Sequence, residues 1–193
     1  DRTLGTQMKA TGEVMAIERT MEASMLKAVR CLEIGLTHLE MPELKALSDE
    51  EIRAKIKNID DERCFVIAEA MRRGVTIDEI NAITKIDRWF LSKIQNIIKM
   101  ERALETHALT PSLLRKAKKM GFADKTIAAR VGKTEFEIRD MRKANGIIPT
   151  YKMVDTCAAE FEAATPYYYS CYETEDEVQV SDKKKVVVLG SGP

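Results

Sequence analysis

Side chains that commonly carry out catalysis or bind metals are sparse in this chain. The two histidines, His38 and His107, have no partner at ligand spacing. The four cysteines are widely separated and form no Cys-x-x-Cys pair: Cys31, Cys64, Cys157 and Cys171. Zinc or redox chemistry is therefore not indicated, and reduced cytosolic thiols are expected. No Ser/His/Asp or Cys/His arrangement predicts a nucleophilic active site.

Charged runs give equally little sign of a catalytic site. Asp60–Glu62 suits the first turn of a helix, where carboxylates complement the dipole. Glu173–Glu177 lacks the glycine and the spacing of a calcium loop, so we expect a solvated linker. Lys183–Lys185 could contact phosphate, but such runs more often keep a neighbouring hydrophobic strand soluble.

The last apolar run resembles the start of a nucleotide site. Val186–Leu189 predicts a strand that needs neighbouring strands, and Gly190–Gly192 provides a Gly-x-Gly turn. In phosphate sites such a turn leads into a helix, whose N-terminus faces the anion. Because no helix follows in this sequence, we assign no cofactor or metal site to the turn.

Composition limits the class of protein. A length of 193 residues suits one or two domains, and 45% hydrophobic with 32% charged residues allows a folded core. The formal net charge is zero, which favours neither nucleic acid nor an acidic membrane surface as partner. No apolar run is long enough to span a bilayer, and no signal peptide is recognised.

Helix start and stop signals recur through the central region. Capping boxes begin at Ser48, Thr76 and Thr134. Three further starts carry a capping side chain at Thr20, Asp87 and Thr110, the last one before a proline. Glycines stand where helix ends need left-handed backbone: Gly74, Gly121 and Gly146. The predicted fold class is mainly α, a multi-helix orthogonal bundle flanked by short extended pieces.

Helical periodicity predicts which faces are buried. The apolar face of the first helix is expected to hold Met21, Met25, Ala28, Val29 and Leu32. The face of the helix that starts at Asp87 is expected to hold Phe90, Ile94, Ile97, Ile98 and Leu104. Tyr167–Tyr172 is expected to be an extended or packed segment.

A weak internal repeat is visible at a shift of about 47 residues. Gly74 then aligns with Gly121, and Trp89 aligns with Phe136. Caps align with caps and apolar residues with apolar residues, which favours a duplicated helical unit.

Residues 124–142 also match a helix-turn-helix pattern, with Gly132 in the turn and Thr134 as the second cap. A nucleic-acid-binding module is therefore the alternative function. Against it, the first turn of the recognition helix would carry Glu135 and Glu137, which repel phosphate. A compact helix pair explains the pattern better.

Five stretches of this sequence resemble motifs of the large chain of carbamoyl phosphate synthetase. They occur in the same order as in that family and at about the same spacing, and together they extend over essentially the whole sequence. They resemble the family patterns QMKSxGEVMAIGRT, IDxWFL, GFxD, VDTCAAEF and VLGxGPxRIGQG. In this sequence they are Gln7–Ile17, Ile86–Leu91, Gly121–Lys125, Val154–Phe161 and Val188–Pro193.

The resemblance implies a domain organisation. Residues 1–33 would be the C-terminal tail of the carboxyphosphate-forming half, and residues 34–178 the helical oligomerisation domain. Residues 179–193 would be the first strand and turn of the carbamoyl-phosphate-forming half, so the sequence would be a fragment that breaks off inside that half. The two halves are ATP-grasp units, and the fragment alone would be inactive and serve assembly.

The resemblance also implies the chemistry of a parent ligase. That cytoplasmic enzyme makes carbamoyl phosphate from bicarbonate, glutamine-derived ammonia and two ATP, for arginine and pyrimidine synthesis. It uses Mg or Mn with K, but the nucleotide and metal ligands lie in segments that this chain lacks. Implied partners are the remainder of the large chain, the glutaminase small subunit and further copies through the helical domain.

The resemblance implies one site residue. Glu13, the glutamate of the GEVM motif, would lie beside the tunnel that carries carbamate between the two active sites; an ordinary loop glutamate is the alternative. Glu18 stands where the family usually has glycine. A glycine there could serve a turn or a close approach, so Glu18 puts the packing near Arg19 in question.

Overall fold

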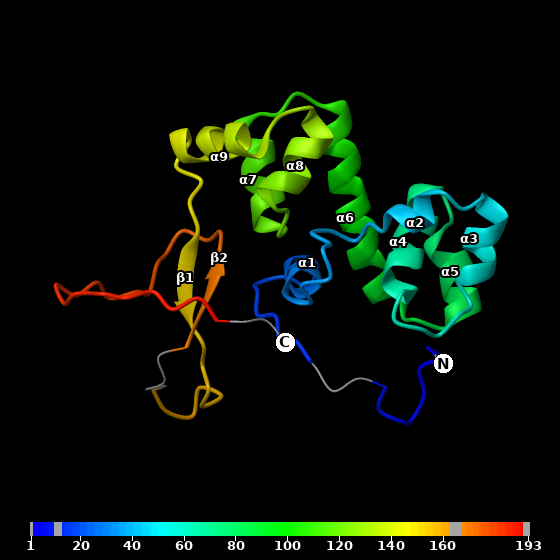
Figure 1. Ribbon diagram of the computed structural model, residues 1–193, viewed down its shortest axis with the longest axis horizontal. Helices are drawn as coiled ribbons and strands as arrows, with labels where there is room; N and C mark the ends of the chain where they lie inside the picture. The colour runs from blue at the N-terminus through cyan, green and yellow to red at the C-terminus, as the bar shows by residue number, and fades with distance from the viewer. Residues whose placement is uncertain (1, 10–12, 163–166, 191–193) are drawn as a thin grey trace.

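A computed structural model describes residues 2–9, 13–162 and 167–190, and within them the chain forms nine helices and two strands (Figure 1). The mainly helical fold class is confirmed. The helices are α1 (Met21–Cys31), α2 (Pro42–Lys45), α3 (Asp49–Lys55), α4 (Arg63–Arg72), α5 (Ile77–Thr84), α6 (Arg88–Thr106), α7 (Pro111–Lys119), α8 (Asp124–Val131) and α9 (Glu135–Ala144). The strands are β1 (Thr150–Met153) and β2 (Tyr168–Cys171).

The helix starts follow the predicted caps. Ser48, Thr76 and Thr134 each form a complete capping box, with side chain and backbone bonded reciprocally to the glutamate three residues on. The Thr20 side chain accepts a hydrogen bond from the Ala23 N–H, and that of Asp87 from the Trp89 N–H. Local side-chain chemistry therefore sets where these helices begin.

The internal repeat is visible in the helix bounds and in the turns between helices. A shift of 47 residues superposes the bounds of α5 on those of α8, and the first residue of α6 on that of α9. The turns ahead of α5 and α8 match as well, because Gly74 and Gly121 have φ angles of +90° and +88°. The units α4–α5–α6 and α7–α8–α9 therefore repeat the same order of helices and turns, and in each unit the last helix contacts the other two. They differ in the length of that last helix.

The long helix α6 joins the two units (Figure 1). One continuous hydrophobic cluster extends through both. Its buried residues include Leu91, Ile94, Ile97, Ile98 and Leu104. The prediction for Phe90 is wrong, since this side chain is 46% exposed. Leu91 takes the buried position because it lies three residues before Ile94 and seven before Ile98, on the same helical face.

Helix α1 lies at the centre of the view, between the two units (Figure 1). Its predicted buried face is wrong by about one residue: the buried residues are Glu22, Ala23, Leu26 and Val29. The periodicity missed this face because it includes the charged Glu22. Burial of that carboxylate is offset by a 2.8 Å hydrogen bond from the Asn96 side chain of α6.

The two strands form an antiparallel pair in which Thr150 faces Cys171 and Met153 faces Tyr168. The tyrosine-rich segment is extended as expected, whereas its partner β1 was not predicted. Beyond the hairpin, Val186–Leu189 form no strand with any described segment, and these side chains are 82–89% exposed. The strand predicted for this run is absent, because no described strand lies beside it to form a sheet. The glycine turn predicted after the run extends into residues 191–193, which lie outside the described residues.

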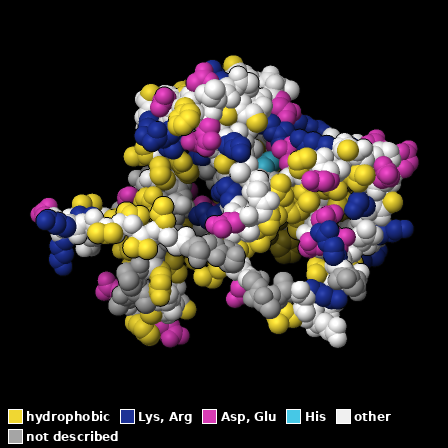
Figure 2. All heavy atoms as spheres, in the orientation of Figure 1, with side chains coloured by type: hydrophobic (Ala, Val, Ile, Leu, Met, Phe, Trp, Pro, Cys, Tyr) yellow, Lys and Arg dark blue, Asp and Glu magenta, His cyan; other side chains and the backbone are white. Residues whose placement is uncertain are grey.

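Acidic and basic side chains are interspersed over the helices on the face shown in Figure 2. This pattern agrees with the formal net charge of zero. None of the helices in the described ranges is long and apolar enough to span a membrane.

Candidate functional site

Glu13 lies in the extended segment that leads into α1, and its side chain is exposed. The residues just before it, 10–12, lie outside the described residues. Further along the segment, Glu18 and Arg19 come immediately before the cap of α1. The position of Glu13 is therefore set by how this segment attaches to the helices behind it.

The Lys27 ammonium group makes that attachment. Its Nζ donates to the carbonyl of Ile17 at 2.9 Å and to the carbonyl of Ser170 in β2 at 2.6 Å. The same atom lies 2.7 Å from the Glu18 carboxylate, and both side chains are largely buried. One ammonium group thus joins the segment after Glu13, helix α1 and strand β2. Glu18, which replaces the glycine expected from the resemblance, neutralises it.

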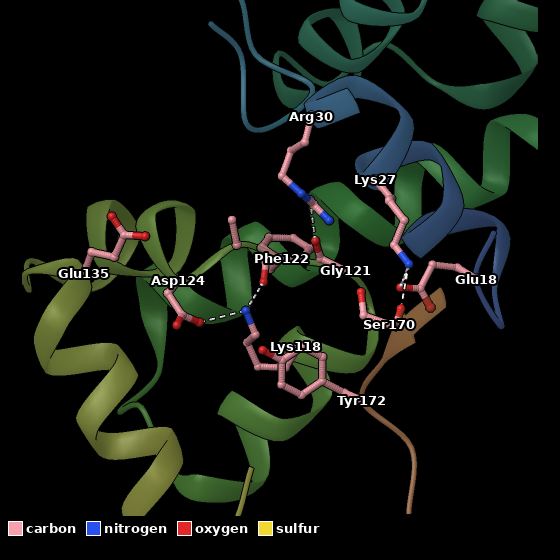
Figure 3. A pocket seen from close by; sticks show the side chains of 11 residues that line it. Glu18, Lys27, Arg30, Lys118, Gly121, Phe122, Asp124, Glu135, Ser170 and Tyr172 are labelled. Atoms are coloured by element: carbon pink, nitrogen blue, oxygen red, sulfur yellow. Dashed lines mark hydrogen bonds and ion pairs between the residues drawn. The ribbon is translucent and has the colours of Figure 1, made fainter. Parts of the chain in front are cut away.

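Next to this joint is a hollow of about 250 Å³, between α1, the α7–α8 turn and β2 (Figure 3). Arg30 enters it from α1 and donates from Nη1 to the Gly121 carbonyl at 2.8 Å. Burial lowers the pKa of Arg30, and no described carboxylate forms an ion pair with it. Glu135 lies across the hollow from it and is exposed.

Lys118 and Asp124 form the floor of the hollow. Lys118 is 6% exposed, lies 2.7 Å from Asp124 and donates to the Phe122 carbonyl at 2.7 Å. Asp124 also accepts a 2.7 Å hydrogen bond from Arg142, so one carboxylate serves two cations. Burial lowers the pKa of Lys118 and outweighs the opposing effect of Asp124; the cations Arg142 and Arg30 lower it further.

A second charged cluster lies in the interior between the two units. Glu101 accepts hydrogen bonds from Arg72 at 2.8 Å and from His38 at 2.7 Å. Burial acts to raise the pKa of Glu101, but these two donors and the nearby Arg130 outweigh it and lower the pKa to about 2. Glu101 is 2% exposed, so its carboxylate is out of reach of a substrate, and removing one of its partners would leave a buried charge uncompensated.

The histidines and cysteines are not brought together. His38 is buried against Glu101, and burial lowers its pKa, whereas His107 is exposed at the end of α6. The cysteines, all within the described ranges, are unpaired. Nowhere in the described residues are three or more His, Cys, Asp or Glu side chains grouped to hold a metal ion.

The helix-turn-helix candidate is present as a helix pair. Helices α8 and α9 meet at a tight turn in which Gly132 has left-handed backbone. The first turn of α9 carries Glu135 and Glu137, and the capping hydrogen bonds from Thr134 lower the pKa of Glu137. The end of α9 that would enter a DNA groove is therefore negatively charged, which opposes contact with phosphates.

Large aromatic side chains are exposed at the same place in both copies of the repeat. Trp89 at the start of α6 is 52% exposed, and Phe136 at the start of α9 is 73% exposed. Trp89 also makes an edge-on contact with Phe90 at 5.0 Å between ring centroids. Exposed aromatic side chains of this kind are enriched at protein–protein interfaces.

The comparison with protein families agrees with this architecture. Residues 13–146, from the segment of Glu13 to the end of the second three-helix unit, match the model of the carbamoyl-phosphate synthetase large chain, oligomerisation domain. The match covers more than half of the chain and includes α1 and both copies of the repeat. This chain therefore belongs to the carbamoyl-phosphate synthetase large chain oligomerisation domain family.

Proposed function

We propose that this chain is the helical connection between the two catalytic halves of a carbamoyl-phosphate synthetase large chain, and that it acts in assembly rather than in catalysis. The observation that carries the proposal is the family match over residues 13–146. In this proposal ATP, Mg or Mn, and K bind to other parts of the parent enzyme.

The proposed boundaries follow the sequence motifs. Residues 1–33 would belong to the carboxyphosphate-forming half, 34–178 to the helical domain and 179–193 to the carbamoyl-phosphate-forming half. Helix α1 would then be the part of the first half that is anchored in the helical domain, through the contact of Ala23 with Gly121. The exposed run Val186–Leu189 would obtain its strand neighbours from the second half.

The activity proposed for the parent protein is synthesis of carbamoyl phosphate from bicarbonate, glutamine-derived ammonia and two ATP, for arginine and pyrimidine formation. A glutaminase small subunit would supply the ammonia in the cytoplasm. The test is to express the complete reading frame with that subunit and to measure glutamine-dependent carbamoyl phosphate formation. Activity of residues 1–193 alone would contradict the assembly role.

Within that enzyme we assign Glu13 a position beside the carbamate passage. The exposed side chain would be covered by the catalytic halves, and Lys27 would hold its segment in place through Glu18 and Ile17. In the complete enzyme, Glu13→Ala should lower carbamoyl phosphate formation while both partial ATP reactions continue. Glu43→Ala, a carboxylate in the first turn of α2, is the control. Equal overall rates in the two variants would refute the assignment.

Self-association through the helical domain is the second part of the assembly role. The exposed Trp89 and Phe90 are the side chains we assign to the contact between copies. Sedimentation velocity over a range of concentrations should show a larger species that Trp89→Ala with Phe90→Ala shifts toward monomer. Phe161→Ala, which removes a more exposed aromatic side chain outside the helices, should leave the distribution unchanged. A monomer at every concentration would contradict the role.

A further inference from the structure

The hollow between α1, the α7–α8 turn and β2 holds more positive charge than the carboxylates around it neutralise. Four cations surround it or support its floor: Lys27, Arg30, Lys118 and Arg142. Two carboxylates are paired with them, Glu18 with Lys27 and Asp124 with both Lys118 and Arg142. Arg30 has no carboxylate partner among the described residues, and the exposed Glu135 at the rim forms no ion pair with any of them.

This surplus of positive charge costs free energy because the cations are partly buried. Lys118 is almost completely buried, and Arg142 and Arg30 both repel it. Charges in such surroundings interact more strongly than charges in bulk water, since the local dielectric is lower. An anion that enters the hollow would relieve the repulsion as well as gain attraction.

The donors in the hollow suit an oxyanion. The guanidinium group of Arg30 uses one N–H on the Gly121 carbonyl, and its planar fork has further N–H groups to donate. The Ser170 and Tyr172 side chains line the same hollow and each carries a hydroxyl. Figure 3 shows Arg30 entering from one side, with Lys118 and Tyr172 opposite. A volume of about 250 Å³ holds a small oxyanion together with water.

We propose that this hollow is a binding site for a small oxyanion of the phosphate class, with Arg30 as its main ligand. With the exposed Glu135 included, four cations and three carboxylates lie around the hollow or below its floor, and Arg30 is the cation without a carboxylate partner among the described residues. The inference rests on residues of this chain alone and does not depend on the proposed function. The site is separate from Glu13 and from the exposed Trp89 surface.

The test uses the chain of residues 1–193 and inorganic phosphate as the probe. Phosphate is titrated at pH 7.5 and constant ionic strength, with binding followed by the NMR signals of the Arg30 Nε–H and of the Gly121 and Phe122 amides. We expect saturable binding with a Kd on the order of 1 mM. Acetate, which carries one charge and a carboxylate like that of an acidic side chain, should bind at least threefold more weakly.

Matched variants separate a built site from general charge attraction. Arg30→Gln should weaken phosphate binding at least tenfold, and Arg30→Lys by a smaller factor, because it keeps the charge and loses the planar fork. Arg139→Gln, which removes the same charge from an exposed position on α9, should change nothing. Glu135→Gln should strengthen binding, since the variant removes the unpaired carboxylate at the rim.

The following results would overturn the proposal: no saturable phosphate binding, an equal loss in Arg30→Gln and Arg139→Gln, or equal affinity for acetate. If Arg30→Gln does not fold, as judged by far-UV circular dichroism, Arg30→Lys and Glu135→Gln decide the matter. Unchanged affinity in both of those variants would also count against the site.

Discussion

Gly121 offers a direct test of how α1 is held in the fold. A Cβ at this position would lie 2.8 Å from the Ala23 Cα and 3.2 Å from its carbonyl oxygen, and the neighbouring atoms are backbone that cannot rotate away. Gly74 occupies the equivalent position of the other repeat with nearly the same φ, but a Cβ there meets open space. Comparing the same substitution at Gly74 and at Gly121 therefore separates the cost of backbone strain from the cost of the close approach of α1.

The expected magnitudes differ accordingly. Both Gly74→Ala and Gly121→Ala place a side chain in left-handed backbone, which costs about 1–2 kcal/mol. Only Gly121→Ala adds overpacking against α1, typically about 1–3 kcal/mol more. The total for Gly121→Ala is therefore about 2–5 kcal/mol, enough to threaten the stability of a domain of ordinary marginal stability.

Urea unfolding followed by circular dichroism at 222 nm measures the two losses under one condition. Gly121→Ala should show the lower midpoint, and hydrogen exchange should show that the extra loss is concentrated in α1. Equal midpoints for the two variants would refute the reasoning, because the close approach of Ala23 in α1 to Gly121 would then add no cost.

Two further predictions concern the buried charges. The pKa of Glu101 falls from 4.5 to about 2 on folding, so its contribution of about 3 kcal/mol is present above pH 4.5 and is lost as the pH falls toward 2. Acid titration of the free energy of unfolding should show that loss, and Glu101→Gln should reduce the dependence on pH by this share, while Glu79, whose pKa is also lowered to about 2, keeps its own; an unchanged slope would contradict the prediction. Lys27→Met should raise amide exchange in both the 13–20 segment and β2, whereas Lys45→Met, at a more exposed ion pair, should not. If the amide exchange of β2 stays unchanged in Lys27→Met, Lys27 does not hold β2 against α1.

The helical part of the fold could be read from the sequence because its signals are local. A capping box spans four residues, so Ser48, Thr76 and Thr134 mark helix starts whatever the rest of the chain does. The repeat could be read for the same reason, since each unit carries its own caps and turn glycines. The buried faces were harder to predict, because hydrophobic periodicity treats Glu22 as a surface residue. It gives no sign of the hydrogen bond from Asn96 that allows this carboxylate to be buried.

The candidate site could not be read in the same way. Lys27 and Ser170 are 143 residues apart, and no spacing rule relates a lysine to a distant carbonyl oxygen. Arg30 and Lys118 look like ordinary surface cations at the ends of helices, where positive charge suits the dipole. The only signal in the sequence was Glu18, an unusual residue at its position in the motif, and its role became clear only from the contact with Lys27.

The long reach of the Lys27–Ser170 contact has a consequence for the order of folding. Most helix–helix contacts within each three-helix unit join neighbours in the chain, and local contacts form quickly. The contact between Lys27 in α1 and Ser170 in β2 closes a loop of 143 residues. It cannot form before residue 170 has left the ribosome. During synthesis the two units can therefore fold while α1 is still unattached at its β2 side. We expect this late-closing joint to be the place where a nascent or stressed chain is first cut by proteases.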